Sequence, residues 1–368
     1  MKIAVVSSLT EYATANYLVR ALRRAGHPLL VISDVPTTEA DIHATGTPDV
    51  AAIAEGRGFV PELLLFVEGG SMQLFPTGLE HLECPTAWYG IDTHTNYTRH
   101  LRIARLFDAT FVAQKMFVER LSREGARRVE WLPLAFPSEL FSDPEQTRPI
   151  DTAFVGSLDP AIYPDRARLF KAAQQVVTRA EFGPASPADM SRRYSQAKIV
   201  LNRSFNNDVN MRYFEAMGAG AVLLTDPVIN NGAEDLFHAG EHYLVYRSES
   251  ELLDSIRWLL GQPEKARAIG LAARKCVEAQ HTYDHRVQQV LEVARALKKQ
   301  TRPDAADYFA ALVALNLPGP ATGMAARAMA NMGQGTRRQA INQVLGSAIA
   351  GIACVGNVLS RLTRRRAK

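Results

Sequence analysis

The sequence predicts an α/β protein of two doubly wound, Rossmann-like domains followed by a helical tail. Short apolar runs typical of buried parallel strands alternate with amphipathic segments along residues 1–300. The chain has 368 residues, enough for two such domains, and its hydrophobic fraction of 47% and charged fraction of 22% are those of a globular protein. A stretch with three prolines and little apolar periodicity, residues 136–149, divides the alternation into two blocks.

The first block, residues 1–138, predicts an N-terminal domain that begins with a βαβ unit. KIAVVSS is followed by an amphipathic helix over 13–25, which Gly26 ends, and then by the apolar run LLVIS. Further strands are expected at ELLLFVE, TAWYGI, ATFVA and RVEWLP, with helices near 97–106 and 114–124. No charged leader or cleavage site precedes the first strand, and three scattered cysteines lack metal-ligand spacing, so we expect a cytoplasmic protein.

The second block, residues 150–285, predicts a C-terminal domain of the same kind. Its strands are expected at TAFVG, KIVLN and AVLLT, and its helices near 165–177, 187–196 and 249–260. A closing helix over 286–300 and a basic helical tail over 301–368 complete the predicted order.

The stretch NMRYFEAMGAGAVLLTD, residues 210–226, is the most informative part of the chain. Read as a helix from about Val209, it places Asp208, Arg212 and Glu215 on one face with apolar flanks on both sides. We therefore expect a mostly buried helix whose polar stripe faces a slot or a narrow solvated edge. A glycine turn and the buried strand AVLLT follow it.

The polar loop 203–208 joins the strand KIVLN to this helix, and its position indicates where a ligand binds. In an open parallel sheet, ligands lie beyond the carboxyl ends of the strands, where helix N-termini offer free N–H groups to phosphate. The structural alternative is that Arg212 and Glu215 form an ion pair on a solvated face.

The pattern Asn-x-Arg-x-x-Glu-Ala-x-x-x-Gly at 210–220, with the apolar strand after it, resembles the donor-site helix of CgeB-like glycosyltransferases. TAFVGSLDPAIYPDRARLF, 152–170, resembles the first strand, glycine turn and helix start of that family's donor domain, and HTYDHRV, 281–287, resembles its closing segment. PTAWYGIDTHTN, 85–96, and residues 107–136 resemble the end of its acceptor domain. The resemblance implies the GT-B fold, in which two Rossmann-like domains face each other across a cleft.

The chemistry of a nucleotide sugar assigns roles to residues of the donor domain. An ionised carboxylate accepts hydrogen bonds from both ribose hydroxyls, and the resemblance gives that role to Glu215. The departing diphosphate needs cations, for which Arg166 and Arg212 are candidates. Gly156 and Ser157 end the strand TAFVG, where the backbone can approach the phosphates closely.

Two asparagines near the helix start have open roles. Asn210 is expected either to bond phosphate or sugar, or to cap the helix. Many retaining GT-B enzymes carry a second glutamate eight residues before the ribose-binding one, and here that position is Asn207. Asn207 can donate a hydrogen bond to a sugar hydroxyl but carries no charge, so we do not assume a retaining mechanism.

On the acceptor side, Asp92 and His94 follow TAWYGI at its carboxyl end, and Glu68 ends ELLLFVE in the same way. An inverting transfer needs a base to take the acceptor's proton, and Asp92 or His94 fits that role. A helix cap is the structural alternative for Asp92, and Glu11 is a further candidate base. The sequence shows no metal-ligand cluster, and the resemblance implies an enzyme that needs no metal.

Residues 301–368 carry the basic charge of the chain. They hold nine Lys or Arg against two Asp, whereas the whole chain has a net charge of +4, so the body is slightly acidic and we expect no specific nucleic-acid partner. Residues 339–360 lack charges and precede RLTRRRAK. This segment is compatible with a buried packing helix, an interfacial helix on an anionic membrane surface, or a membrane span.

We therefore expect a glycosyltransferase of polysaccharide or glycoconjugate biosynthesis, acting in the cytoplasm or at the inner face of the membrane. Its donor would be a UDP-, GDP- or TDP-sugar, and its acceptor a glycan, a lipid-linked sugar or a protein. Two alternatives stay open: a nucleotide-sugar epimerase of the same fold, and a non-catalytic carbohydrate-binding or assembly protein, which Asn207 keeps in consideration.

Overall fold

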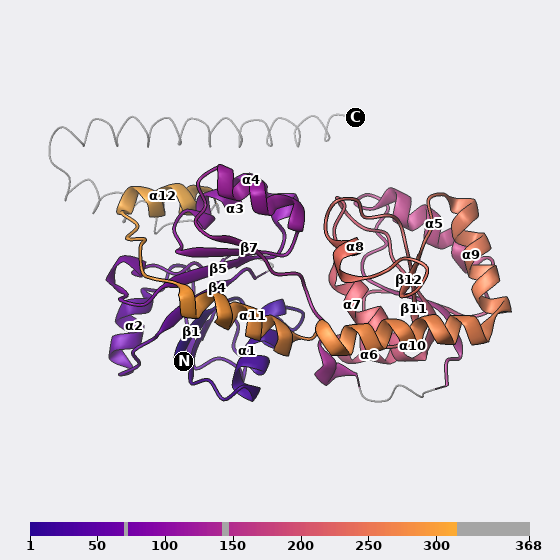
Figure 1. The fold of residues 1–368 in the computed structure, drawn as a ribbon, viewed down its shortest axis with the longest axis horizontal. Coiled ribbons are helices and arrows are strands. Elements are labelled where there is room, and N and C mark those ends of the chain that lie inside the picture. Colours follow the sequence, from indigo (N-terminus) through magenta and orange to yellow (C-terminus); the bar gives the residue numbers. More distant parts are fainter. Residues whose placement is uncertain (70–72, 142–146, 315–368) are drawn as a thin grey trace, which may run out of the picture.

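Two parallel β-sheets, each covered by helices, form the body of the protein (Figure 1). The structure is a computed structural model, and it describes residues 1–69, 73–141 and 147–314. The predicted architecture of two α/β domains with parallel sheets is confirmed. The uncharged segment 339–360 and its basic flank lie outside the described residues.

Seven parallel strands form the sheet of the N-terminal domain, in the order β3-β2-β1-β4-β5-β6-β7. The order reverses between β1 and β4, and in such sheets the carboxyl ends of the two strands at the reversal open a crevice. The strands are β1 (Ile3–Val6), β2 (Leu29–Ser33), β3 (Ile42–His43), β4 (Leu63–Val67), β5 (Thr86–Gly90), β6 (Ala109–Val112) and β7 (Val129–Trp131). The helices of this domain are α1 (Thr14–Arg24), α2 (Val50–Gly56), α3 (Thr93–Ala104) and α4 (Val118–Arg123), with short 3₁₀ turns at η1 (Leu79–His81) and η2 (Lys115–Phe117).

Five parallel strands form the second sheet, in the order β12-β11-β10-β8-β9, which reverses between β8 and β10. The strands are β8 (Ile150–Val155), β9 (Ala180–Gly183), β10 (Ala197–Leu201), β11 (Val222–Thr225) and β12 (Tyr243–Val245). The helices are α5 (Pro164–Gln174), α6 (Pro187–Gln196), α7 (Met211–Gly218), α8 (Ala233–Leu236), α9 (Glu249–Gly261) and α10 (Pro263–Gln280), and the 3₁₀ turn η3 (Ser138–Leu140) precedes the domain.

The helix of the 210–226 stretch begins later than predicted. Helix α7 starts at Met211, because the side chain of Asn210 accepts a hydrogen bond from the backbone N–H of Arg212 and so caps the helix. The predicted start near Val209 is therefore wrong, and Asp208 lies in the preceding loop instead of on the polar face of the helix. The expected burial of the apolar flanks is confirmed, since Tyr213, Phe214, Ala216 and Met217 are all buried.

The two domains are joined by two chain crossings that lie side by side. The backbone N–H of Phe136, in the first crossing, donates to the carbonyl oxygen of His281 in the second, at 2.8 Å. Arg286 also connects the two crossings, because its Nε donates to the carbonyl oxygens of Pro133 at 2.8 Å and Leu134 at 3.3 Å. The crossings therefore form one compact hinge.

After the second crossing, the chain returns to the N-terminal domain. Helix α11 (Tyr283–Ala296) packs against α1, and α12 (Ala305–Ala314) packs against α3 (Figure 1). The hydroxyl of Tyr308 on α12 accepts from the backbone N–H of Leu79 and donates to a carboxylate oxygen of Glu80, both at 2.7 Å. The start of the predicted tail is thus attached to the first domain.

Candidate functional site

A cavity of about 360 Å³ lies between the domains, at the carboxyl ends of the second sheet's strands. Six of the residues singled out from the sequence line it together: Asp92 and His94 from the first domain, and Arg166, Asn210, Arg212 and Glu215 from the second. Gly156, Ser157 and Asn207 do not line it, and neither does Glu11.

Arg212 spans the strand reversal of the second sheet. Its Nη2 donates to the carbonyl oxygen of Val155 at 2.5 Å, and its Nη1 donates to Oδ1 of Asn202 at 2.6 Å. Its Nε donates to the hydroxyl of Tyr194 at 3.1 Å. Arg212 and Glu215 form no ion pair in the described part of the chain, so the structural alternative for this pair is not realised. The guanidinium is therefore held at the strand ends by neutral acceptors.

Arg166 is the second cation of the cavity and is 9% exposed. Its guanidinium donates to the carbonyl oxygens of Ser157 at 3.3 Å and Arg203 at 3.0 Å, while its buried Nε has no hydrogen-bond partner among the described residues. The ring of Tyr163 lies against it at 4.1 Å. Burial, and then the nearby Arg212, lower the pKa of Arg166. Two guanidiniums without a carboxylate counterion in the described residues favour binding of an anion.

Glu215 lines the same cavity, and its carboxylate makes no hydrogen bond within the described residues. Burial raises its pKa to about 7, and the positive charge of Arg212 opposes that rise. A carboxylate that is desolvated and unpaired can accept hydrogen bonds from a ligand that brings its own hydroxyl donors.

Gly156 and Ser157 support the arginines instead of lining the cavity. Gly156 has φ +147°, and a Cβ there would lie 2.9 Å from the ring of Phe154 and 3.2 Å from Nη2 of Arg212, so a side chain would displace the guanidinium. The carbonyl oxygen of Ser157 is one of the acceptors of Arg166.

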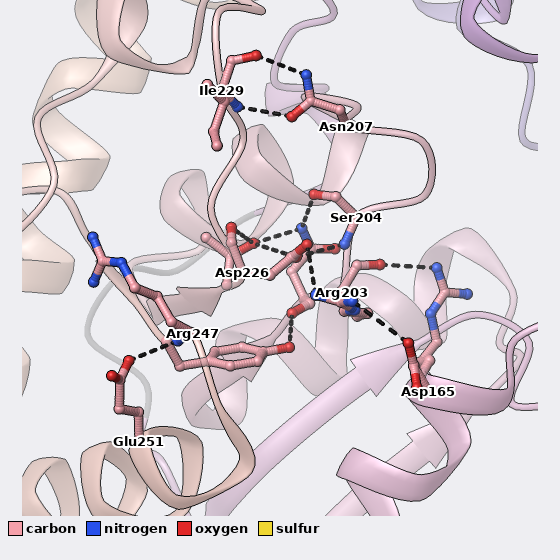
Figure 2. Close-up of polar contacts among 12 residues, drawn as sticks. Asp165, Arg203, Ser204, Asn207, Asp226, Ile229, Arg247 and Glu251 are labelled. Atoms are coloured by element: carbon pink, nitrogen blue, oxygen red, sulfur yellow. Dashed lines mark hydrogen bonds and ion pairs between the residues drawn. The ribbon is translucent and has the colours of Figure 1, made fainter.

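Asn207 does not line the cavity, and its side chain is paired with Ile229 (Figure 2). Its Nδ2 donates to the carbonyl oxygen of Ile229 and its Oδ1 accepts from the N–H of Ile229, both at 2.7 Å. Its φ of +62° turns the chain ahead of α7. Near the start of the same loop, the backbone N–H of Ser204 donates to the carboxylate of Asp226, which follows β11, at 2.6 Å. Asn207 and Asp226 thus fix the loop that positions the start of α7.

Asn210 both caps α7 and borders the cavity. Besides accepting from Arg212, it donates through Nδ2 to Oδ1 of Asn202 at 3.2 Å. The capping role expected from the sequence is therefore present in the structure, and it leaves the Asn210 side chain tied to the same asparagine that holds Arg212.

Asp92 and His94 are held by a buried chain of polar groups beneath them. Asp92 occupies the N-cap position of α3, but its side chain makes no capping hydrogen bond. The backbone N–H groups of Ile91 and Asp92 instead donate to Glu68, whose other oxygen lies 3.0 Å from Nε2 of His100. Burial alone would raise the pKa of Glu68, but His100 and the two N–H groups lower it below its usual range. Glu68 thus positions the turn that carries Asp92.

Asp92 is exposed and lines the cavity, and its surroundings there raise the pKa of its carboxyl group. The surrounding walls raise its pKa to about 6, the charge of Glu68 adds to the rise, and His94 opposes it. The ring of His94 lies edge-to-face with that of Phe205 from the second domain, at 6.5 Å between centroids. The two domains are therefore in contact at His94, one of the two candidate catalytic residues.

Among the other residues of the cavity, Phe205 and Asp208 contact the first domain. Sequence spacing placed Asp208 only in a helical stripe and did not identify Phe205. Asp208 is buried, and its Oδ1 accepts from Nε2 of Gln114 in the first domain at 2.9 Å. No local pattern reveals such contacts, since the partners lie 94 residues apart. The described residues contain no cluster of three or more His, Cys, Asp or Glu side chains placed to hold a metal. No helix in the described ranges is long and apolar enough to span a membrane.

The fold is similar to that of several solved structures. Anabaena Alr3699/HepE in complex with UDP and glucose is similar over 81% of this chain and 100% of its own, with a TM-score of 0.60 and 14% identity. A sucrose-phosphate synthase from Thermosynechococcus elongatus is similar over 80% of this chain and 98% of its own (TM-score 0.57, 14% identity). A glycosyltransferase from Rickettsia africae ESF-5 is similar over 80% and 97% (TM-score 0.58, 11% identity). The chain therefore has the GT-B fold, as expected.

The second domain also has a match in sequence. Residues 146–292, which contain the whole second sheet, match a family described as glycosyl transferase-like. No curated protein matches the chain.

Proposed function

We propose that the protein is a glycosyltransferase, which moves a sugar from a nucleotide-activated donor to an acceptor hydroxyl. One observation carries the proposal. At the strand reversal of the second sheet, the unpaired carboxylate of Glu215 shares a cavity with Arg166 and Arg212, which lack carboxylate partners in the described residues. A nucleoside diphosphate offers the matching groups, a ribose diol and two phosphates. The match of residues 146–292 supports the same conclusion.

In this proposal, the second domain binds the donor. Glu215 accepts from the ribose hydroxyls, and Arg166 and Arg212 bind the diphosphate. When the bond between the anomeric carbon and the diphosphate oxygen breaks, its electron pair leaves with the diphosphate. A guanidinium about 4 Å away stabilises that charge by about 4 kcal/mol at an effective dielectric constant of about 20. The arginines would thus replace a metal ion in this step.

The first domain supplies the base. Asp92 borders the cavity, and with a pKa of about 6 it is largely ionised at neutral pH and can take the proton of the attacking hydroxyl. His94 lies beside it and favours its ionised form. The motif at 210–220 makes a CgeB-like enzyme our finer hypothesis, and UDP-glucose is the first donor to test, since it is the ligand named for HepE and for an α-glucosyltransferase of similar fold.

Nucleotide release from a panel of UDP-, GDP- and TDP-sugars tests the proposal. Transfer predicts release that depends on an added acceptor, whereas epimerisation predicts an altered sugar without release, and a non-catalytic protein predicts binding alone. Glu215→Ala should abolish nucleotide binding, while Glu264→Ala, an exposed carboxylate on α10 outside the cavity, should not. Unchanged nucleotide affinity in Glu215→Ala would contradict the assigned site.

A further inference from the structure

A second cavity, of about 320 Å³, adjoins the first one on the side of the N-terminal domain. The two cavities share Asp92, Asp208, Asn210 and Met211, so a group in one lies next to a group in the other. The remaining walls come from the turn after β1, the first residue of α1, and residues that follow β4, β5 and β7. The second cavity is therefore at the strand reversal of the first sheet, as the donor cavity is at that of the second.

The charges that line the two cavities differ. Glu68, Asp92 and Asp208 line the second cavity, and no Lys, Arg or His side chain does so among the described residues. Arg166 and Arg212 line only the first. A phosphate or carboxylate in the second cavity would lie beside the carboxylates of Asp92 and Asp208, and no cationic side chain among the described residues lines the cavity to bind it.

Asp208 shows that this cavity is built to accept hydrogen bonds. It is only 8% exposed, and one of its oxygens accepts from Gln114, whereas its other oxygen has no hydrogen-bond partner in the described part of the chain. Burial raises its pKa, and His94 opposes the rise. The second oxygen lies at the border of both cavities, where it can accept a hydrogen bond from a hydroxyl group of a bound ligand.

Tyr12 adds an aromatic surface to the same cavity. It lies on the turn after β1 and is 59% exposed, so its ring is accessible to a ligand in this cavity. A sugar ring has a face of C–H groups that stacks on an aromatic ring and a rim of hydroxyl donors that carboxylates accept. Tyr12 with Asp208 and Asp92 offers that combination.

We infer that this second cavity binds the acceptor, and that the acceptor presents an uncharged carbohydrate instead of a phosphorylated or carboxylated one. The inference rests on the proposed glycosyltransferase function. The acceptor hydroxyl oxygen bonds to the anomeric carbon, the carbon–diphosphate bond breaks with its electron pair on the diphosphate, and the hydroxyl proton passes to Asp92. Asp208 accepts from another hydroxyl and orients the sugar.

The experiment compares pairs of sugars with the full-length protein after saturation with UDP. Methyl glucoside, methyl galactoside and methyl mannoside are paired with their 6-phosphates, and binding at millimolar concentration is measured by saturation-transfer NMR. UDP binding by the protein is measured beforehand by calorimetry. If no UDP binding is found, the proposed function is refuted, and this result is distinct from a failure of the acceptor inference. Release of UDP from UDP-glucose is then measured with each sugar that binds.

We expect at least one uncharged sugar to bind at least tenfold more tightly than its 6-phosphate, and Tyr12→Ala to weaken it. Asp208→Asn should reduce the difference in affinity between the uncharged sugar and its 6-phosphate, because it removes a negative charge from the cavity. Glu55→Gln, which changes an exposed carboxylate of the first domain outside both cavities, should leave that difference in affinity unchanged. Equal or tighter binding of the 6-phosphates overturns the inference. Binding of no uncharged sugar to the UDP-loaded protein, or binding that Tyr12→Ala does not alter, overturns it as well.

Discussion

Replacing Glu215 by glutamine should stabilise the protein while it abolishes nucleotide binding. Burial raises the pKa of Glu215 from 4.5 to about 7. An acid with a higher pKa in the folded chain binds its proton more tightly there, so stability falls as pH rises from the unfolded value to the folded one. The free energy of unfolding falls by less than about 1 kcal/mol near pH 5 and by about 3 kcal/mol near pH 8, relative to its value below about pH 4. Glutamine keeps the shape and removes the charge.

Urea denaturation at the two pH values measures this difference. Glu215→Gln should exceed the wild type by about 3 kcal/mol near pH 8 and by less than about 1 kcal/mol near pH 5, and calorimetry on the same samples should show loss of UDP binding. Glu264→Gln serves as the exposed control. If the variant gains no stability at the higher pH, the burial argument is refuted. If it gains stability but still binds UDP, the ribose assignment fails alone.

Three further changes test other parts of the structure. Arg212→Lys keeps the charge but loses the three hydrogen bonds to neutral acceptors, so UDP affinity measured by calorimetry should fall about tenfold. Gly218→Ala should lower the free energy of unfolding in urea by about 1–3 kcal/mol, because its Cβ would lie 2.3 Å from the ring of Phe136. The kcat/KM for transfer should fall as pH drops below about 6, because Asp92 is then protonated and cannot act as the base.

Each of these three predictions has a control variant and a result that would contradict it. Arg168→Lys, on an exposed face of α5, should leave UDP affinity unchanged, and an equal loss in both arginine variants would contradict the role of Arg212. Gly261→Ala meets no atom within 4 Å and should be neutral, so similar costs at both glycines would rule out the clash. Asp92→Asn should remove the acid limb of the pH profile, and a limb that persists would assign the base elsewhere.

Regular elements were predictable where local signals agree. The helix expected over 187–196 is found as Pro187–Gln196, because Ser186 caps it and proline suits the first helical position. The start of α7 was less predictable, since several asparagines precede it and any of them could cap a helix. Only the contacts of Asn207 with Ile229 show that the earlier asparagine holds a loop instead.

The candidate site was predictable as far as it depends on one segment. Spacing on α7 and a recognisable motif indicated Arg212 and Glu215, and both line the cavity. The ion-pair alternative fails because Arg212 is drawn to acceptors at two strand ends, which only the sheet topology brings together. Spacing also pointed to Asp208, but as a member of a helix; its contact with Gln114 of the other domain leaves no periodic trace in a sequence.

The hinge determines how the two halves of the cavity can move. Phe136 bonds directly to His281, and Arg286 donates to two carbonyl oxygens of the first crossing, so we expect any rotation of one domain relative to the other to take place at this point. Such a rotation would change the distance between Asp92 of the first domain and Arg212 of the second. For the proposed glycosyltransferase, we therefore expect a substitution at this hinge, far from the chemistry, to alter KM and kcat together.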